Sequence, residues 1–140
     1  MLYRLLRPDE DWQLGLSAKF PNSTTSVFEY VSNGSWGSYS KYISTCGSLN
    51  SVLSFRSKSR NPRAQIVQIS EENLEIEKID LRPATNRMQF YINCSYSNKS
   101  INTFNNFARV FEEVLLVGHV PASHIQPMKE TDFVSEQLPV

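Results

Sequence analysis

Residues 111–121 read FEEVLLVGHVP. Val114 to Val117 form a continuous apolar run, which is typical of a strand buried on both faces of a sheet. Glu112 and Glu113 stand at the entrance to this strand, where a carboxylate is partly desolvated and can stabilise developing positive charge. Because acidic residues are mostly exposed, this segment by itself favours a solvated turn, and the rest of the chain has to decide.

The length of 140 residues indicates one domain, which we place at residues 1–130, followed by a frayed tail at residues 131–140. Fourteen basic residues balance fourteen acidic ones, so the total charge favours neither nucleic acid nor a membrane surface as a partner. The N-terminus is too short and too charged for a signal peptide, and no apolar run approaches the length of a membrane span. With only Cys46 and Cys94, we expect a reducing, cytoplasmic location. A secreted or delivered toxin domain is compatible with the same sequence.

The first half of the chain alternates short strands and helices. Leu2 to Leu6 has the alternation of a strand, and Arg4 points the same way as its two outer leucines. A buried arginine on such a strand needs an anionic partner, whereas a rim arginine would extend into solvent. The expected elements that follow are a helix at Thr24–Ser32, a Ser/Gly-rich loop at Asn33–Ser40, a strand at Tyr42–Thr45 and a helix capped by Ser48.

A basic run follows this helix, Arg56 to Arg63, which is the candidate anion-binding segment of the chain. Ser95 to Asn106 is polar, rich in Asn and without a period, and this composition predicts a loop leading to the Glu113 strand. The other expected elements are strands at Gln65–Ile69, Ile76–Leu81 and Ser123–Met128 and a weak helix at Ala84–Ile92.

Three segments occur in an order, and with local sequences, that resemble the mono-ADP-ribosyltransferases of the Arg-Ser-Glu class, the cholera-toxin-like group. LYRLLRPDE at residues 2–10 resembles the first-strand arginine segment of that group. YISTC at residues 42–46, followed by Ser48-Leu49, resembles its Ser-Thr-Ser strand and the next helix. EVLLVGHVPASHI at residues 113–125 resembles its catalytic glutamate strand and Gly-x-Ile-Pro turn.

The resemblance implies an α+β fold: a split β core of two mostly antiparallel sheets with flanking helices and a cleft that binds NAD as a substrate. Arg4 would bind phosphate and ribose of the nicotinamide half. Ser44 and Thr45 would order the cleft and would hold the catalytic glutamate and the nicotinamide ribose of the cofactor by hydrogen bonds. Glu113 would accept a hydrogen bond from the ribose 2′-hydroxyl and stabilise the oxocarbenium-like state as nicotinamide leaves. Arg56 would lie near the cofactor phosphates.

Two positions depart from the family pattern. Cys46 replaces the third residue of the Ser-Thr-Ser strand, a small change of similar size. Phe111 stands two residues before Glu113, where arginine-modifying members have Glu and others have Gln, so it would bear on acceptor specificity. If the strand extends back to Phe111, alternation puts that ring on the same face as Glu113 and puts Glu112 on the other.

We therefore expect an NAD-dependent ADP-ribosyltransferase with a macromolecular acceptor, either protein or nucleic acid. An NAD glycohydrolase, which needs no acceptor residue, and a non-catalytic NAD-binding or interaction module of the same fold are the alternatives. The sequence leaves the acceptor and any neutralising partner open. Cys46, Cys94, His119 and His124 lack the spacing of a zinc site, so no metal is expected, and Cys46 is read as a buried structural thiol.

Overall fold

The computed structural model describes residues 1–33 and 40–137. Its strands form a six-stranded sheet in the order β5-β6-β3-β1-β4-β8 and a two-stranded sheet, β2-β7, and each pairing is antiparallel. The expected α+β fold of two antiparallel sheets with flanking helices is confirmed. The strands are β1 (Leu2–Leu5), β2 (Leu16–Ser17), β3 (Tyr42–Cys46), β4 (Ile66–Ile69), β5 (Glu77–Asp80), β6 (Glu113–Val117), β7 (His119–Val120) and β8 (Ile125–Pro127).

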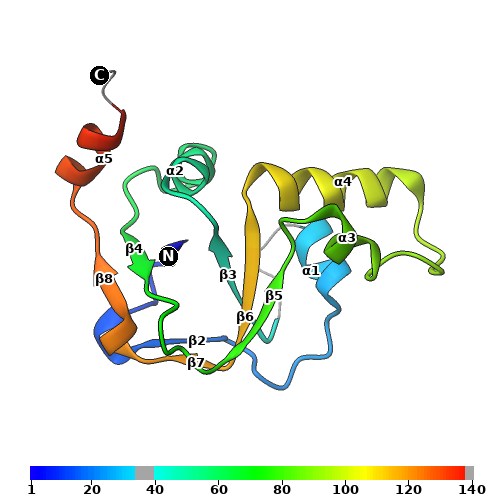
Figure 1. The fold of residues 1–140 in the computed structure, drawn as a ribbon, viewed down its shortest axis with the longest axis horizontal. Coiled ribbons are helices and arrows are strands. Elements are labelled where there is room, and N and C mark those ends of the chain that lie inside the picture. The colour runs from blue at the N-terminus through cyan, green and yellow to red at the C-terminus, as the bar shows by residue number, and fades with distance from the viewer. Residues whose placement is uncertain (34–39, 138–140) are drawn as a thin grey trace.

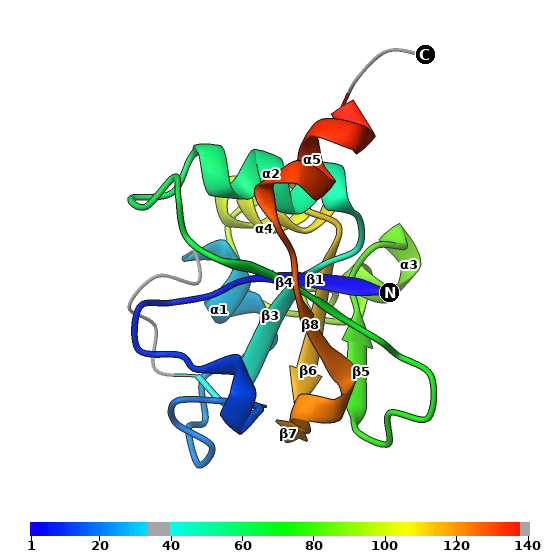
Figure 2. The same ribbon diagram turned by 90° about the vertical axis from the view of Figure 1, so that its left-hand side faces the viewer.

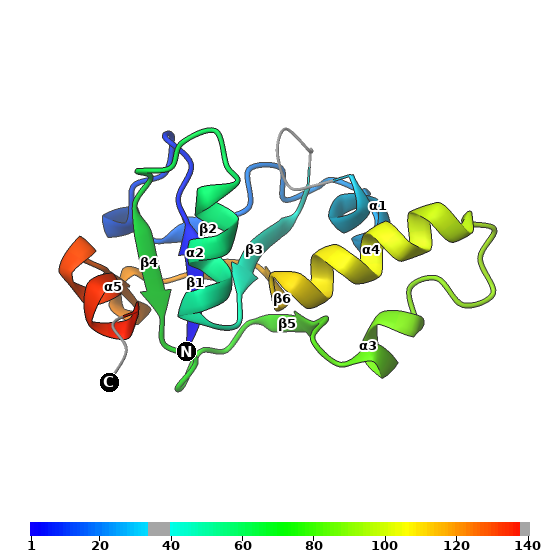
Figure 3. The ribbon, with the colours of Figure 1, turned by 90° about the horizontal axis from the view of Figure 1, so that it is seen from above.

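Helices lie at both ends of the larger sheet (Figure 1). The helix α2 packs on β1 and β3, opposite the end where β2 and β7 pair. Seen from above, α1 and α4 lie side by side beyond β6 (Figure 3). The helices are α1 (Val27–Ser32), α2 (Leu49–Ser57), α3 (Ala84–Met88), α4 (Asn98–Val110) and α5 (Glu130–Gln137), with single 3-10 turns at Trp12–Leu14 and Ala122–His124.

The strand β6 is buried on both faces, as its continuous apolar run predicts. Val114 and Leu116 pack into a core that contains residues of both sheets. Leu115 faces the other core, which includes residues of α1 and α4. β6 lies between β5 and β3, and its first residue, Glu113, pairs with Cys46. The order of the strands thus brings a late segment of the chain beside an early one.

Most of the helices and strands that the sequence predicts are present, but they are shorter than predicted. Ser26 accepts a hydrogen bond from the Glu29 N–H at the start of α1, and Ser48 forms a capping box with Ser51 at the start of α2. The predicted strands at Gln65–Ile69 and Ile76–Leu81 are β4 and β5. The expected Ser/Gly-rich loop at Asn33–Ser40 lies outside the described residues apart from its two ends.

The expected loop at Ser95–Asn106 is wrong, because this segment forms most of α4. Ser97 caps the helix by accepting from the Ser100 N–H, and Phe104 and Ala108 are completely buried on its inner face. Ile101, Phe104 and Ala108 have helical spacing, which the many Asn and Ser residues obscured. Packing against α1 therefore outweighs a poor intrinsic helix propensity.

The expected frayed tail from Thr131 is also wrong as far as Gln137, because residues 130–137 form α5. Phe133 is buried in a cluster with Leu49, Val52 and Phe111, and the Arg56 guanidinium lies 4.9 Å from the centre of its ring. Arg56 also pairs with Glu130 at 2.8 Å, so α5 is fastened beside α2 (Figure 2). The partners of this helix lie far away in the sequence, which is why local pattern does not reveal it.

Replacing Phe104 tests the packing of α4. We expect Phe104→Ala to lower the free energy of unfolding by about 3–5 kcal/mol, because it leaves a cavity in the centre of the α1–α4 core. Val110→Ala, on the same helix but 41% exposed, should change it by less than about 0.5 kcal/mol. Denaturant unfolding of both variants gives the comparison, and equal losses would contradict a packed helix here.

Candidate functional site

Arg4 on β1, Ser44 on β3 and Glu113 on β6 lie on three adjacent strands of the larger sheet. β1 pairs with β3 at one position only among the described residues, Tyr3 with Cys46, and otherwise pairs along its length with β4. The guanidinium of Arg4 bridges to β3 beyond that pair, because Nη1 donates to the Ser44 carbonyl at 2.6 Å. The three sequence-predicted residues thus meet where β1 and β3 separate.

Arg4 is buried, and its partner is Glu10. The carboxylate accepts from Arg4 Nε at 3.1 Å and from Nη2 at 2.9 Å, and it also accepts from the Arg7 backbone N–H at 2.8 Å. Sequence reasoning required an anion for a buried Arg4 but did not identify Glu10. The signal was available, because the turn Pro8-Asp9-Glu10 is the nearest source of a carboxylate that can fold back onto β1.

Glu113 is buried beside Arg4 and Ser44. The Ser44 hydroxyl donates to Glu113 Oε1 at 2.6 Å, so Ser44 uses its side chain for Glu113 and its carbonyl for Arg4. Burial raises the pKa of Glu113 to about 7, while the hydrogen bond from Ser44 and the charge of Arg4 act in the opposite direction. A carboxylate with this pKa changes its charge close to neutral pH.

Tyr30 is a pocket residue that the sequence indicated only as helix core. It reaches the site from α1, is buried, and lines the pocket with its hydroxyl near Ser44. Burial, followed by the charge of Glu113, raises the pKa of Tyr30 to about 12, so its hydroxyl keeps its proton. A buried tyrosine hydroxyl needs a polar partner, and this requirement could have connected Tyr30 to Ser44.

Arg4, Ser44, Glu113 and Tyr30 line one pocket with a volume of about 270 Å³. Cys46 lies in its wall as a structural thiol, because burial raises its pKa and keeps it protonated. Three phenylalanines, Phe55, Phe107 and Phe111, form an aromatic part of the wall. The pocket therefore combines the charged side chains of Arg4 and Glu113 with apolar aromatic rings.

Phe111 also lines this pocket, and it lies in the turn between α4 and β6. The strand begins at Glu113, so strand alternation does not set the direction of the Phe111 side chain. Phe111 instead ends α4, packs edge-on against Phe55 at 5.2 Å, and has the Lys58 ammonium 5.6 Å above its ring. Lys58 is the cation of the basic run that lines the pocket.

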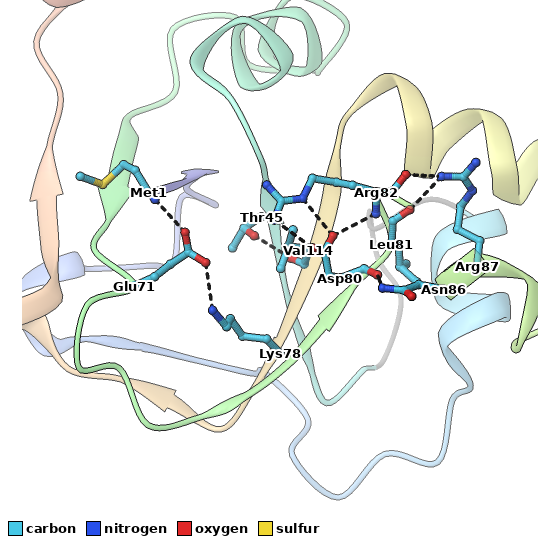
Figure 4. Close-up of polar contacts among 10 residues, drawn as sticks. All are labelled: Met1, Thr45, Glu71, Lys78, Asp80, Leu81, Arg82, Asn86, Arg87 and Val114. Carbon is cyan, nitrogen blue, oxygen red and sulfur yellow. Dashed lines mark hydrogen bonds and ion pairs between the residues drawn. The ribbon is translucent and has the colours of Figure 1, made fainter. Parts of the chain in front are cut away.

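Thr45, Arg56 and Glu112 are not among the described residues that line the pocket. The Thr45 hydroxyl donates to the Val114 carbonyl at 2.6 Å and ties β3 to β6 (Figure 4). Arg56 is engaged with Glu130 and Phe133, as described above. Glu112 has a positive φ of 49°, and its carboxylate accepts from the Ser48 hydroxyl at the start of α2. All three secure the framework around the site.

A second set of hydrogen bonds holds the backbone of Glu113. The Leu81 N–H donates to the Glu113 carbonyl at 3.0 Å. The buried guanidinium of Arg87 in turn holds the Leu81 and Arg82 carbonyls at 3.0 and 2.6 Å, and its Nε donates to Asn105 of α4 (Figure 4 shows the carbonyl contacts). The residues after β5, together with α3 and α4, thereby hold the backbone of Glu113 in place.

The described residues contain no cluster of three or more His, Cys, Asp or Glu side chains that could hold a metal ion. In the same part of the chain, no helix has both the length and the apolar character to cross a bilayer.

The raised pKa of Glu113 makes a prediction about stability. The folded state holds this proton more tightly than the unfolded state, so the stabilisation is full below the ordinary pKa of 4.5 and is lost as the pH rises through about 7. Glu113→Gln keeps an oxygen acceptor for Ser44 and removes the titration. We therefore expect Glu113→Gln to be more stable than wild type at pH 8, by roughly 1–3 kcal/mol, and to lose this advantage near pH 4. Thermal melts across this range make the measurement, and a difference independent of pH would contradict the burial of an ionising Glu113.

No family model matches the chain, and no curated protein sequence does so. Among solved structures, one named EcPltA is similar in fold, with a TM-score of 0.55. The alignment covers 96% of this chain and 78% of that chain at 15% sequence identity. A likeness at this identity concerns the fold alone, and it matches nearly the whole described chain to one solved architecture.

Proposed function

We propose that the protein is an NAD-dependent mono-ADP-ribosyltransferase that moves ADP-ribose to a macromolecular acceptor and releases nicotinamide. The observation that carries this proposal is the meeting of Arg4, Ser44 and Glu113, from three distant segments, in one pocket. These are also the three residues that the family resemblance implies for such a site. Their direct contacts through Ser44 are what a shared site requires.

The chemistry proposed for this site is the cleavage of a glycosidic bond. Arg4 would bind a phosphate of NAD, since a planar guanidinium matches phosphate oxygens well. The ionised Glu113 would accept from the ribose 2′-hydroxyl and stabilise positive charge on the ribose as the bond to nicotinamide breaks, with the electron pair leaving on nicotinamide. The acceptor then bonds to C1′ and loses its proton. Burial strengthens the electrostatic interaction of Glu113 with the ribose.

The size of the pocket fits part of a dinucleotide. A volume of about 270 Å³ falls slightly below the range of roughly 300–1,000 Å³ in which whole small ligands are usually enclosed. We therefore expect the nicotinamide half of NAD to enter the pocket and the adenosine half to lie outside it. Arg7 and Lys58, which also line the pocket, add positive charge for the phosphates.

A second candidate, NAD glycohydrolase, is favoured by Phe111. A phenyl ring cannot accept a proton or donate a hydrogen bond, so it cannot activate an acceptor as the family's Glu or Gln would. Water as the acceptor would need only Arg4, Ser44 and Glu113. Incubation with labelled NAD, with and without cell lysate, separates transfer from hydrolysis, and binding without nicotinamide release would identify a non-catalytic module. Protease or nuclease treatment then identifies a labelled acceptor.

The adjacent glutamates provide a matched pair of variants. We expect Glu113→Gln to slow nicotinamide release in a single turnover by about 10²–10³, because it removes the charge that would face the oxocarbenium-like state. Glu112→Gln keeps an acceptor for Ser48 and should stay within several-fold of wild type. If both variants retain activity and remain folded, the proposed mechanism is wrong.

Phe111 provides a test of acceptor recognition. Phe111→Leu keeps an apolar wall but removes the flat ring, which could stack on a base or pack on an apolar acceptor surface. We expect transfer to the acceptor to fall several-fold more than hydrolysis of NAD. Phe55→Leu, which changes the neighbouring ring, is the control. An equal loss of both activities in the Phe111 variant would mean that the ring serves core packing alone.

A further inference from the structure

The ion pair between Arg4 and Glu10 is almost completely removed from solvent. The two side chains are 8% and 7% exposed, and two hydrogen bonds join them, one to each carboxylate oxygen. Glu10 is itself held, because one of its oxygens accepts from the Arg7 backbone N–H. A buried pair of this kind gains little net stability over an apolar replacement, since both ions lose their hydration, so its geometry is the feature to explain.

The hydrogen bonds of Arg4 determine which of its donors remain for a ligand. A guanidinium carries five N–H groups, and Arg4 donates three of them, from Nε and Nη2 to Glu10 and from Nη1 to Ser44. At most one N–H on each terminal nitrogen is left. These remaining N–H donors of Nη1 and Nη2, here called the Arg4 fork, are the ones from which phosphate oxygens can accept.

We infer that Glu10 is the positioning residue of the anion site: its carboxylate holds the Arg4 guanidinium so that the Nη1–Nη2 fork is presented to a phosphate oxygen of NAD. The identity of the ligand rests on the function proposed above. Arg4 lines the pocket, whereas Glu10 is not among the described residues that do. Glu10 therefore acts through Arg4 and does not touch the ligand.

Two effects of Glu10 on anion binding oppose each other. Its negative charge offsets that of Arg4 and weakens the attraction for phosphate, whereas its hydrogen bonds prevent the guanidinium from turning away. Because oriented, charge-assisted hydrogen bonds depend steeply on geometry, orientation outweighs charge in this site. Removing the Glu10 charge consequently weakens NAD binding, even though the site becomes more positive.

The test is a double-mutant cycle between Arg4→Lys and Glu10→Gln, with NAD affinity measured by calorimetry and folding by thermal melts. Glu10→Gln should weaken NAD binding roughly 10- to 100-fold, the factor equivalent to one lost charge-assisted hydrogen bond. The control is Glu72→Gln, at an exposed acid that does not line the pocket, and it should stay within about twofold. The double variant should lose clearly less than the sum of the two single losses, because the main contacts of Glu10 are with Arg4, although it also lies 3.9 Å from Arg7 Nε.

Unchanged or tighter binding by a folded Glu10→Gln variant would overturn the inference, as would losses that add fully in the double variant. If Glu10→Gln does not fold, Glu10→Asp replaces it, since the shorter side chain keeps the charge but cannot reach the fork in the same geometry; binding equal to wild type would then be the contrary result.

A second measurement separates this inference from the proposed function. The Arg4 Nε–H signal in nuclear magnetic resonance spectra should be sharp and protected in wild type and broadened in Glu10→Gln, whatever the ligand. If wild type does not bind NAD, the proposed function fails, while this signal still decides the role of Glu10. An equally protected signal in the variant would show that Glu10 does not position Arg4.

Discussion

The buried guanidinium of Arg4 is the interaction on which the rest of the site depends. β1 and β3 pair at a single described position and then separate, and Arg4 spans the separation by donating to the Ser44 carbonyl. Because Ser44 also donates to Glu113, one serine connects the arginine of the first strand to the glutamate of the sixth. A charge buried in this place requires compensation, which Glu10 provides from the following turn.

The strands and helices around this contact bury the carboxylate of Glu113. β5, β3 and the turn after α4 hold the Glu113 backbone, and α1 covers the site with Tyr30. Burial then brings the pKa of Glu113 to about 7. Such a carboxylate is costly for folding and useful for stabilising a developing positive charge, a combination that is common at functional sites. Phe55 of α2 and Phe107 of α4 line the same pocket.

Sequence alone predicted what depends on local pattern and missed what depends on distant partners. The apolar run of β6, the cap at Ser48 and the segments carrying Arg4, Ser44 and Glu113 are local signals, and the family resemblance of those three segments implied the fold class. The helix α4 was missed because its Asn-rich surface conceals the buried Phe104. Glu10 and Tyr30 were missed as site residues because only the folded chain brings them to Arg4 and Ser44.

A crystal structure of Glu113→Gln in complex with NAD tests the central claim most directly, because this variant should retain the intact dinucleotide. The account predicts a phosphate of NAD on the Arg4 fork, with the nicotinamide ribose between Ser44 and the substituted side chain. NAD bound elsewhere on the protein, or an empty pocket at saturating NAD, would contradict it.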